Sequence, residues 1–205
     1  MEKSEKADDP ALVKDDPGAD QGAAEAVVDQ CCEKLIMLKK LLACFFLPGE
    51  VVEFRAFRPS GRGRTRRYFR IWDEIDADLL GLLEPLNERG YGVYFGVNPR
   101  RARGGGRAED VLLARVLCAD FDHATEEFVR MKISDAKFSH PSILVFSGHG
   151  YHAYWLLTES IIDLALWTRH QKAVIQALDS DPDIQDPPRL MRLTGFNNTK
   201  YGESI

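Results

Sequence analysis

Apolar residues recur at intervals of three and four in two long stretches of the chain, which is the spacing of a helix that buries one face. Pro48-Gly49 ends the first stretch and Gly90 ends the second. Pro85 is expected to kink the second helix or end it early, because proline cannot donate the helical hydrogen bond. With two further helices in the second half, the expected helical segments are Ala23–Phe46, Asp73–Arg89, Ala124–Asp135 and Ile161–Leu178.

Other segments alternate apolar and polar residues, as half-buried strands do. The link between Phe146 and Tyr151 is too short for a parallel crossover, so the two strands that it joins must form an antiparallel hairpin. The sequence therefore predicts an α+β fold with a mixed, largely antiparallel sheet. Its expected strands are residues 51–57, 68–72, 91–97, 114–122, 142–146, 151–157 and 190–193.

Charge is distributed unevenly along the chain. Residues 1–30 carry nine acidic residues and three lysines, so the remainder has a net charge of +1 although the whole chain has −5. Residues 1–22 also lack a core-forming pattern, and we expect them to form a disordered acidic tail. The rest, 23–205, is expected to be one domain, with an N-terminal helix and small α/β lobe at 23–107 and a second lobe at 108–205.

The composition argues against several classes of protein. The four cysteines lack Cys-x-x-Cys spacing and histidines at zinc-finger distance, so we expect reduced thiols, as in a cytoplasmic protein. The N-terminus is acidic and lacks the apolar core of a signal peptide. The most apolar stretch, residues 35–47, is short and carries two lysines, so no membrane span and no membrane partner are expected.

Two carboxylates end the apolar run at residues 116–122. Alternation along a strand places Asp120 and Asp122 on one face and turns Phe121 to the other. Carboxylates about 7 Å apart on one strand repel each other unless a cation lies between them. Magnesium and manganese prefer such oxygen ligands, so this pair is a candidate metal site. The alternative is a strand that simply ends in an acidic turn.

The turn of the predicted hairpin is a candidate phosphate site. Gly148 and Gly150 permit positive φ and a close approach of the backbone, so main-chain N–H groups can point at an anion. Ser147 adds a hydroxyl donor and His152 an imidazole donor. The alternative is a tight β-hairpin with an exposed His149 and a packed His152.

A third acidic position precedes the last predicted strand. Asp186 is followed by arginines three and six residues later. A third carboxylate would complete an oxygen-rich site for two metal ions. The sequence does not decide between Asp186, Asp181 and Asp183, and all three can instead belong to an acidic, proline-rich surface loop.

Arginine is concentrated in two segments. Residues 55–70 contain seven arginines and no acid, and residues 100–107 contain four more. Such segments are either a solvated surface or a face that binds phosphates, and binding of the second kind weakens as salt rises. The candidates for contact with a nucleic-acid backbone are Arg62, Arg64, Arg66, Arg67, Arg100, Arg101 and Arg103.

The order of these motifs resembles the archaeo-eukaryotic primase superfamily. Asp-x-Asp at 120–122 is followed by Ser-Gly-x-Gly-x-His at 147–152, and then by an acid with Arg-x-x-Arg-Leu and Gly-x-x-Asn-x-Lys at 189–200. The similarity is greatest to the primase-polymerase domains of replication proteins from plasmids, phages and other mobile elements, and it covers about residues 51–200. Thr194 departs from the pattern, because relatives often have proline at that position.

This resemblance implies a catalytic lobe related to the RNA-recognition-motif fold. It implies a template-dependent nucleotidyltransferase, a DNA primase or DNA polymerase, that uses two Mg²⁺ or Mn²⁺ ions and no organic cofactor. The implied metal ligands are Asp120, Asp122 and Asp186, and the implied nucleotide-binding residues are Ser147, Gly148, Gly150, His152, Arg192, Asn198 and Lys200. The implied partners are a single-stranded DNA template and primer, ribo- or deoxynucleoside triphosphates, and a helicase on a separate or downstream segment.

Two other functions stay open at this point. A replication-initiator nuclease would need two histidines on one strand face and a tyrosine nucleophile, whereas His149 and His152 are wrongly spaced and no helix carries an obvious catalytic tyrosine. A single-stranded DNA-binding module would bind without metal and has no need for acids at three strand ends.

Overall fold

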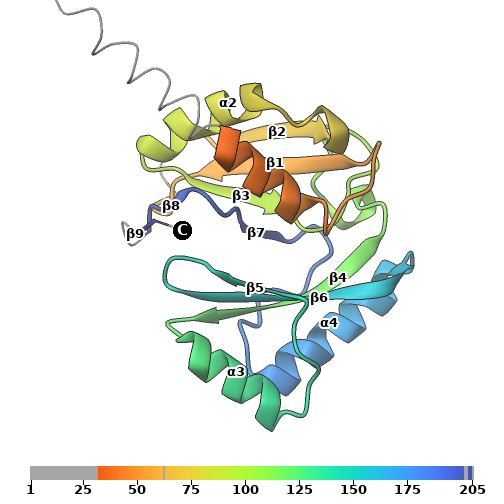
Figure 1. The fold of residues 1–205 in the computed structure, drawn as a ribbon. Helices are drawn as coiled ribbons and strands as arrows, with labels where there is room; N and C mark the ends of the chain where they lie inside the picture. Colours follow the sequence, from red (N-terminus) through yellow and green to blue (C-terminus); the bar gives the residue numbers. More distant parts are fainter. Residues whose placement is uncertain (1–31, 62, 201–202, 205) are drawn as a thin grey trace, which may run out of the picture.

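The computed structural model describes residues 32–61, 63–200 and 203–204, and these residues form two layers, each built on an antiparallel sheet (Figure 1). The upper sheet has the order β2-β1-β3-β7 and the lower one the order β4-β6-β5. The upper strands are β1 Val51–Phe57, β2 Arg66–Ile71, β3 Gly92–Gly96 and β7 Leu190–Arg192. The lower strands are β4 Ala114–Asp122, β5 Ile143–Phe146 and β6 Gly150–Ile161.

Helices cover the outer face of each sheet. A helix over residues 32–42 and α2 Ala77–Glu88 pack on the upper sheet, whereas α3 Glu126–Asp135 and α4 Leu164–Leu178 lie below the lower sheet (Figure 1). The remaining elements are the short 3₁₀ turns Trp72–Glu74 and Ala108–Asp110 and a small ribbon of β8 Asn197–Asn198 with β9 Glu203–Ser204. No helix in the described residues is long and apolar enough to cross a bilayer.

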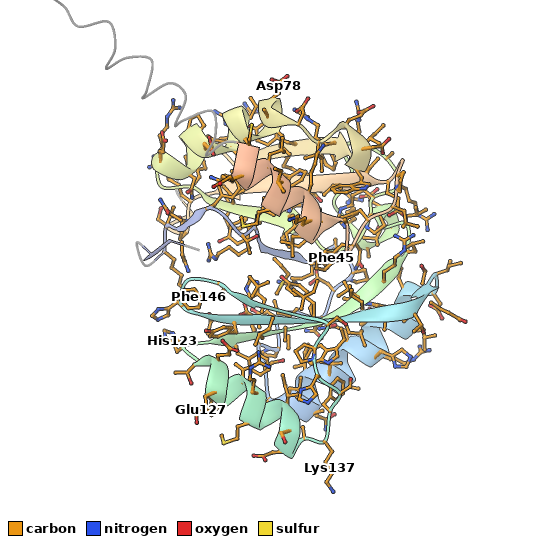
Figure 2. The ribbon with its side chains drawn as sticks, viewed as in Figure 1. Phe45, Asp78, His123, Glu127, Lys137 and Phe146 are labelled. Atoms are coloured by element: carbon orange, nitrogen blue, oxygen red, sulfur yellow. The ribbon has the colours of Figure 1, made fainter. Side chains whose placement is uncertain are left out.

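Phe45 joins the two layers. Its ring lies 5.4 Å from that of Phe95 in the upper sheet and 5.1 Å from that of Tyr154 in the lower one, measured between centroids. Figure 2 shows Phe45 between the two halves of the molecule. The largest apolar core therefore runs from the upper helices into the upper face of β4 and β6. A second core lies under β4 and β6, against α3 and α4.

The predicted α+β fold, its alternating strands and the hairpin at residues 146–151 are confirmed. The expectation that Pro85 would end its helix early is wrong, since α2 continues to Glu88. The last turn is held by tertiary contacts: Asn87 is buried and its side-chain nitrogen donates to the carbonyls of Tyr91 and Asn197, both at 2.9 Å. These contacts outweigh the hydrogen bond that proline cannot make.

The sheet arrangement differs from the prediction in one respect. Every strand pair in the described residues is antiparallel, and the strands form two main sheets in place of one mixed sheet. β7 leaves the second lobe and pairs with β3, so the chain after residue 189 returns to the upper layer. A division at residue 107 is therefore not a clean boundary between lobes. The predicted acidic tail, residues 1–22, lies outside the described residues.

Candidate active site

The first two predicted acids lie at the end of β4, where that strand pairs with the start of β6. Asp120 is directly opposite His152 in the antiparallel register, and Asp122 is opposite Gly150. Directly opposed residues share a face, so the side chains of Asp120 and His152 meet. The Asp120 Oδ1 and His152 Nε2 atoms are 3.6 Å apart, with only 17% and 5% of the two side chains exposed.

The environment of Asp120 is unfavourable for a lone negative charge. Burial raises the pKa of its carboxyl to about 7, the charges of Asp122 and Asp181 add to the rise, and Arg192 and Lys200 oppose it. Its Oδ1 atom is buried without a hydrogen bond among the described residues. A carboxylate in this condition is stabilised by any cation that reaches it.

Asp181 is the loop acid that lies next to the β4 acids. Its backbone N–H donates to the carbonyl oxygen of Asp120 at 3.0 Å, and its charge acts on the Asp120 carboxyl. The three acids Asp120, Asp122 and Asp181, which we call the acidic cluster, line one open hollow of about 330 Å³. Asp181 is one of the two alternatives that the sequence left open for the third carboxylate.

Asp186, the residue first expected in that role, has a different neighbour. Its Oδ1 accepts a hydrogen bond of 2.7 Å from the Nε atom of Arg189, and the same guanidinium reaches the carbonyl of Asp183. The carboxylate of Asp186 is thus paired with an arginine, and its role as metal ligand stays an untested prediction. The geometry favours Asp181 in its place.

Gln171 fixes the position of the acidic loop relative to β4. Its side-chain oxygen accepts from the N–H of Cys118 at 3.0 Å, and its nitrogen donates to the carbonyls of Cys118 and Ile184 at 2.6 and 2.7 Å. One buried amide of α4 therefore joins the free edge of β4 to the loop that carries Asp181. No pattern in the sequence indicates this role, because a single glutamine on a helix face is usually solvated.

His152 is held as a neutral imidazole. Burial, together with the charge of Arg192, lowers its pKa to about 3. Its Nδ1 lies 3.2 Å from the hydroxyl of Tyr154, whose pKa is raised well above its ordinary value by burial. The Tyr154 hydroxyl therefore stays protonated and can donate to Nδ1, which leaves Nε2 as the N–H donor toward the acidic cluster.

The predicted phosphate turn is a tight hairpin at the edge of the same site. The N–H of Ser147 donates to the carbonyl of Gly150 at 2.9 Å, and Gly148 has φ +87°. A side chain at Gly150 would collide with the carbonyl oxygen of Phe121, so the close approach of the two strands requires glycine there. Asn198 donates to the carbonyl of Ser147 at 3.0 Å and so ties the turn to the upper layer.

Arg192 approaches the site from the upper sheet. Its guanidinium lies over the ring of Tyr94, 5.0 Å from the centroid, and the same ring stacks on Phe57 at 4.3 Å with planes 5° apart. Its Nη1 atom is buried and makes no hydrogen bond within the described residues. The charge of Arg192 acts on both Asp120 and His152. A buried guanidinium donor is thus available beside the acidic cluster.

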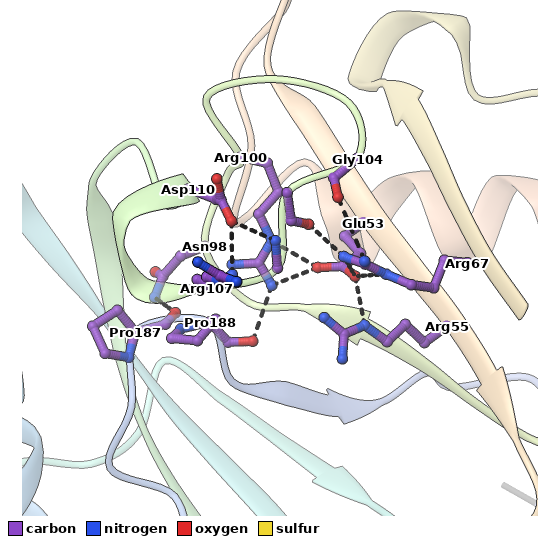
Figure 3. A network of polar contacts seen from close by, with 12 residues as sticks. Glu53, Arg55, Arg67, Asn98, Arg100, Gly104, Arg107, Asp110, Pro187 and Pro188 are labelled. Carbon is purple, nitrogen blue, oxygen red and sulfur yellow. Dashed lines mark hydrogen bonds and ion pairs between the residues drawn. The ribbon is translucent and has the colours of Figure 1, made fainter. Parts of the chain in front are cut away.

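Two of the arginines expected at a nucleic-acid surface instead belong to a network around the buried Glu53 (Figure 3). Arg100 is 1% exposed, donates to Glu53 at 2.8 Å and to the carbonyl of Pro188 at 2.9 Å. Arg67 donates to Glu53 at 2.7 and 2.9 Å and to the carbonyls of Gly104 and Gly105. Burial alone would raise the pKa of Glu53, but the guanidinium groups around it hold that pKa below its ordinary value.

The other predicted arginines are placed differently. Arg64, Arg66, Arg101 and Arg103 are exposed, and Arg103 pairs with Glu74 at 3.0 Å. Arg62 lies outside the described residues. The segment at 101–107 is held by Arg67 and by Asp110, which accepts from the N–H groups of residues 106 and 107 at 2.6 and 2.8 Å.

The donor set at the end of β4 fits a hard divalent cation, although in the described residues no three acidic, histidine or cysteine side chains already converge as a closed metal site. The fit rests on the buried Asp120 oxygen that lacks a hydrogen bond and on the mutual repulsion of three carboxylates. A bound cation would coordinate the Asp120 oxygen and would reduce the repulsion between the carboxylates.

Solved primase structures share this fold. The AEP domain of the cyanophage S-2L primase-polymerase matches with a TM-score of 0.67 over 84% of this chain and 86% of that domain, at 18% identity. A crystal structure of primase RepB′ matches with 0.59, and its catalytic domain in complex with initiator DNA with 0.58, both at 18% identity over 82% of this chain. The chain spans about half (51%) of the first RepB′ structure and 79% of the second. No protein-family model and no curated protein matches the sequence.

Proposed function

Because the chain has the fold of an archaeo-eukaryotic primase-polymerase domain, we propose that it is a template-dependent nucleotidyltransferase, a DNA primase or DNA polymerase. The observation that carries this proposal is the acidic cluster at the end of β4, with His152 opposite and Arg192 beside it. Negative and positive side chains are thus segregated around one site, as the transfer of a nucleotide from a triphosphate requires.

The proposed metal ligands are Asp120, Asp122 and Asp181, with Asp181 in place of Asp186. Two Mg²⁺ or Mn²⁺ ions held there would lower the pKa of an attacking 3′-hydroxyl and neutralise the charge of the departing pyrophosphate. In this scheme the carboxylates act as metal ligands and not as general acids or bases, and a backbone hydrogen bond joins Asp181 to Asp120.

His152 and Arg192 are the proposed contacts for the nucleotide's phosphates. His152 is neutral and is oriented by Tyr154, so it acts as a hydrogen-bond donor and not as a general base. Arg192 presents a buried Nη1 donor that has no partner in the described residues. The Ser147–Gly150 turn and Lys200 complete the phosphate side of the proposed site, while the amide of Asn198 is occupied in holding the turn.

The proposed template interface consists of exposed arginines. Arg64, Arg66, Arg101 and Arg103 keep this role, whereas Arg67 and Arg100 are better explained as holding the 98–107 segment on β1. Contacts of this kind bind the backbone of single-stranded DNA without reading its sequence. A helicase partner and a cytoplasmic location stay predictions from the sequence.

A polymerisation assay with two arms tests the proposal. The first arm supplies a primed template, labelled deoxynucleotides and Mn²⁺ or Mg²⁺, and the second omits the primer and adds ribonucleotides. We expect product from the parent protein in at least one arm and near loss of product with Asp120→Ala or Asp122→Ala, because a lost ligand removes several kcal/mol of charge stabilisation.

The same assay separates the other two functions. Cleaved strands attached covalently to the protein would identify an initiator nuclease instead. Tight binding of single strands, without product and unchanged by Asp120→Ala, would identify a non-catalytic binding module. Either outcome would refute the polymerase proposal.

A further inference from the structure

We propose that a second phosphate-binding site lies in the upper layer, at the end of β1. A pocket of about 330 Å³ opens where the turn after β1, the end of α2 and the segment after β8 meet. We call it the basic pocket, and it is lined by Arg58, Pro59, Ser60, Arg89, Gly90, Thr199 and Lys200.

All charged side chains that line the basic pocket are positive. Three of its lining residues are cations and, among the described residues, none of those that line it is acidic. A larger hollow beside Gly104–Gly106 provides a contrast: it is lined by three arginines, but also by Glu109 and Asp110, and Glu53 already binds two of the arginines. An anion in the basic pocket meets three cationic lining side chains and no acidic one, so it is attracted more strongly there.

Arg58, one of the lining arginines, is held in place by contacts within the protein. One terminal nitrogen of Arg58 donates to the carbonyl of Arg89 at 3.1 Å, and its guanidinium lies 5.2 Å from the centroid of the Tyr91 ring. Because the guanidinium is already held, its other N–H groups can donate to a ligand with little further loss of side-chain entropy. Held in this way, Arg58 is suited to recognise an oxyanion.

A hydroxyl group in the wall points to the same conclusion. The Oγ1 atom of Thr199 is buried and makes no hydrogen bond within the described part of the chain. An unsatisfied buried hydroxyl costs free energy that a bound acceptor would recover. A phosphate oxygen is such an acceptor, and it also suits the three cations.

The ligand follows from the position of the pocket. The charge of Lys200 acts on the carboxyl of Asp120, whereas Arg58, Arg89 and Thr199 belong to no part of the site described above. A phosphate bound here comes either from the backbone of a single strand that leaves the acidic cluster or from the terminal phosphates of a nucleotide. The choice between these sources rests on the proposed function, whereas phosphate binding itself does not.

The test measures binding without catalysis, in EDTA, so that its result is independent of polymerase activity. One arm titrates a labelled 5′-hydroxyl oligothymidylate by fluorescence anisotropy at several salt concentrations, and the other titrates inorganic tripolyphosphate by calorimetry. The variants are the pair Arg58→Gln/Arg89→Gln and the single change Thr199→Val. The matched control is Arg130→Gln/Arg169→Gln, which removes two exposed arginines from α3 and α4.

We expect the double variant Arg58→Gln/Arg89→Gln to bind at least one probe roughly tenfold or more weakly than the parent. Each lost contact is a charge-assisted hydrogen bond. If the strand is the ligand, the slope of log K against log salt should fall by about 1.4 for two lost contacts. Thr199→Val should weaken the same probe without destabilising the free protein. Loss in the first arm identifies a strand phosphate, and loss in the second a nucleotide's phosphates.

Unchanged affinity of the Arg58/Arg89 pair in both arms would overturn the proposal, as would a loss no larger than that of the control pair. Circular dichroism and thermal unfolding of each variant establish that it is folded. Loss of polymerisation in Asp120→Asn without loss of these affinities would leave this inference standing. Failure of the inference and failure of the proposed function are therefore distinguishable.

Discussion

Asp120 is the residue at which stability and the proposed chemistry conflict. Its carboxyl is buried beside two other acids and lacks a hydrogen bond to Oδ1 in the described residues. Its pKa is raised from an ordinary 3.8 to about 7, so the folded state prefers the protonated form. The resulting stability is fully present below pH 4 and is lost as the pH rises through about 7.

This conflict predicts that Asp120→Asn stabilises the metal-free protein at high pH. An asparagine resembles the protonated acid and never acquires the charge, so the gain should be close to zero near pH 4 and should grow through pH 7. A shift of about three pKa units sets an upper value of roughly 4 kcal/mol. Urea unfolding of the parent and the variant in EDTA, at pH 4.5 and pH 8, measures the gain. A gain that does not change with pH would refute this explanation of the raised pKa.

Tyr94 is predicted to position Arg192 for the nucleotide. Its ring contacts both Phe57 and the guanidinium, and a cation over an aromatic face is stabilised by about 0.5 to 2 kcal/mol. Tyr94→Leu should therefore raise the KM for the nucleotide several-fold with little change in kcat, and Tyr94→Phe, which keeps the ring, should restore it. Steady-state extension kinetics at saturating template measure both constants. Equal effects of the two substitutions on KM would argue against the stacking role.

For single residues, the sequence predicted those side-chain directions that follow from alternation along a strand. It placed Asp120 and Asp122 on one face, and the structure agrees. It could not select Asp181, because three aspartates within six residues of an irregular loop have no periodicity that fixes their direction. Nor did it indicate that Glu53 would be buried, since two of its three arginine partners, Arg67 and Arg100, come from other segments of the chain.

At the scale of helices and strands, α4 binds β4 through hydrogen bonds as well as through apolar packing. Trp167 and Gln171 both make hydrogen bonds to the edge of β4 that β6 leaves free, through the carbonyl of Val116 at 2.7 Å and through Cys118. The strand that ends in the acidic cluster is therefore fixed on both sides, by a neighbouring strand and by a helix. This protects an otherwise open strand edge.

Gln171→Leu is predicted to destabilise the fold and to displace the acidic loop. The change leaves one buried N–H and two carbonyls without partners, and each costs about 1 to 3 kcal/mol. Gln176→Leu, on an exposed position of the same helix, is the matched control and should have a small effect. Urea unfolding measures the loss. A loss no greater than that of the control would show that the Gln171 contacts contribute little.

Element boundaries were predictable to different degrees. β1 and β4 agree with the prediction in both ends, because apolar alternation continues along each strand. β6 continues to Ile161, four residues beyond its predicted end, although Thr158, Glu159 and Ser160 are polar and exposed. Its last residues are held by pairing of Ile161 with Ala114, which the local pattern does not contain.

At the scale of the whole molecule, the return of β7 to the upper sheet brings the two layers together around the site. Tyr94 pairs with Arg192 across β3 and β7, which carries Arg192 from the second half of the sequence to the first sheet. The local pattern predicted the strand but not its partner, because strand pairing depends on contacts far apart in the chain. This pairing is why the proposed phosphate contacts come from both layers.

The proposed chemistry requires the three carboxylates of the acidic cluster to bind a divalent cation. Electron paramagnetic resonance of Mn²⁺ titrated into the protein, with a non-hydrolysable nucleotide present, measures this directly. We predict Mn²⁺ binding to the parent, at least tenfold weaker binding to Asp120→Asn and to Asp181→Asn, and nearly unchanged binding to Asp186→Asn, whose carboxylate is paired with Arg189. Equal Mn²⁺ binding by the parent, Asp120→Asn and Asp181→Asn would contradict the account.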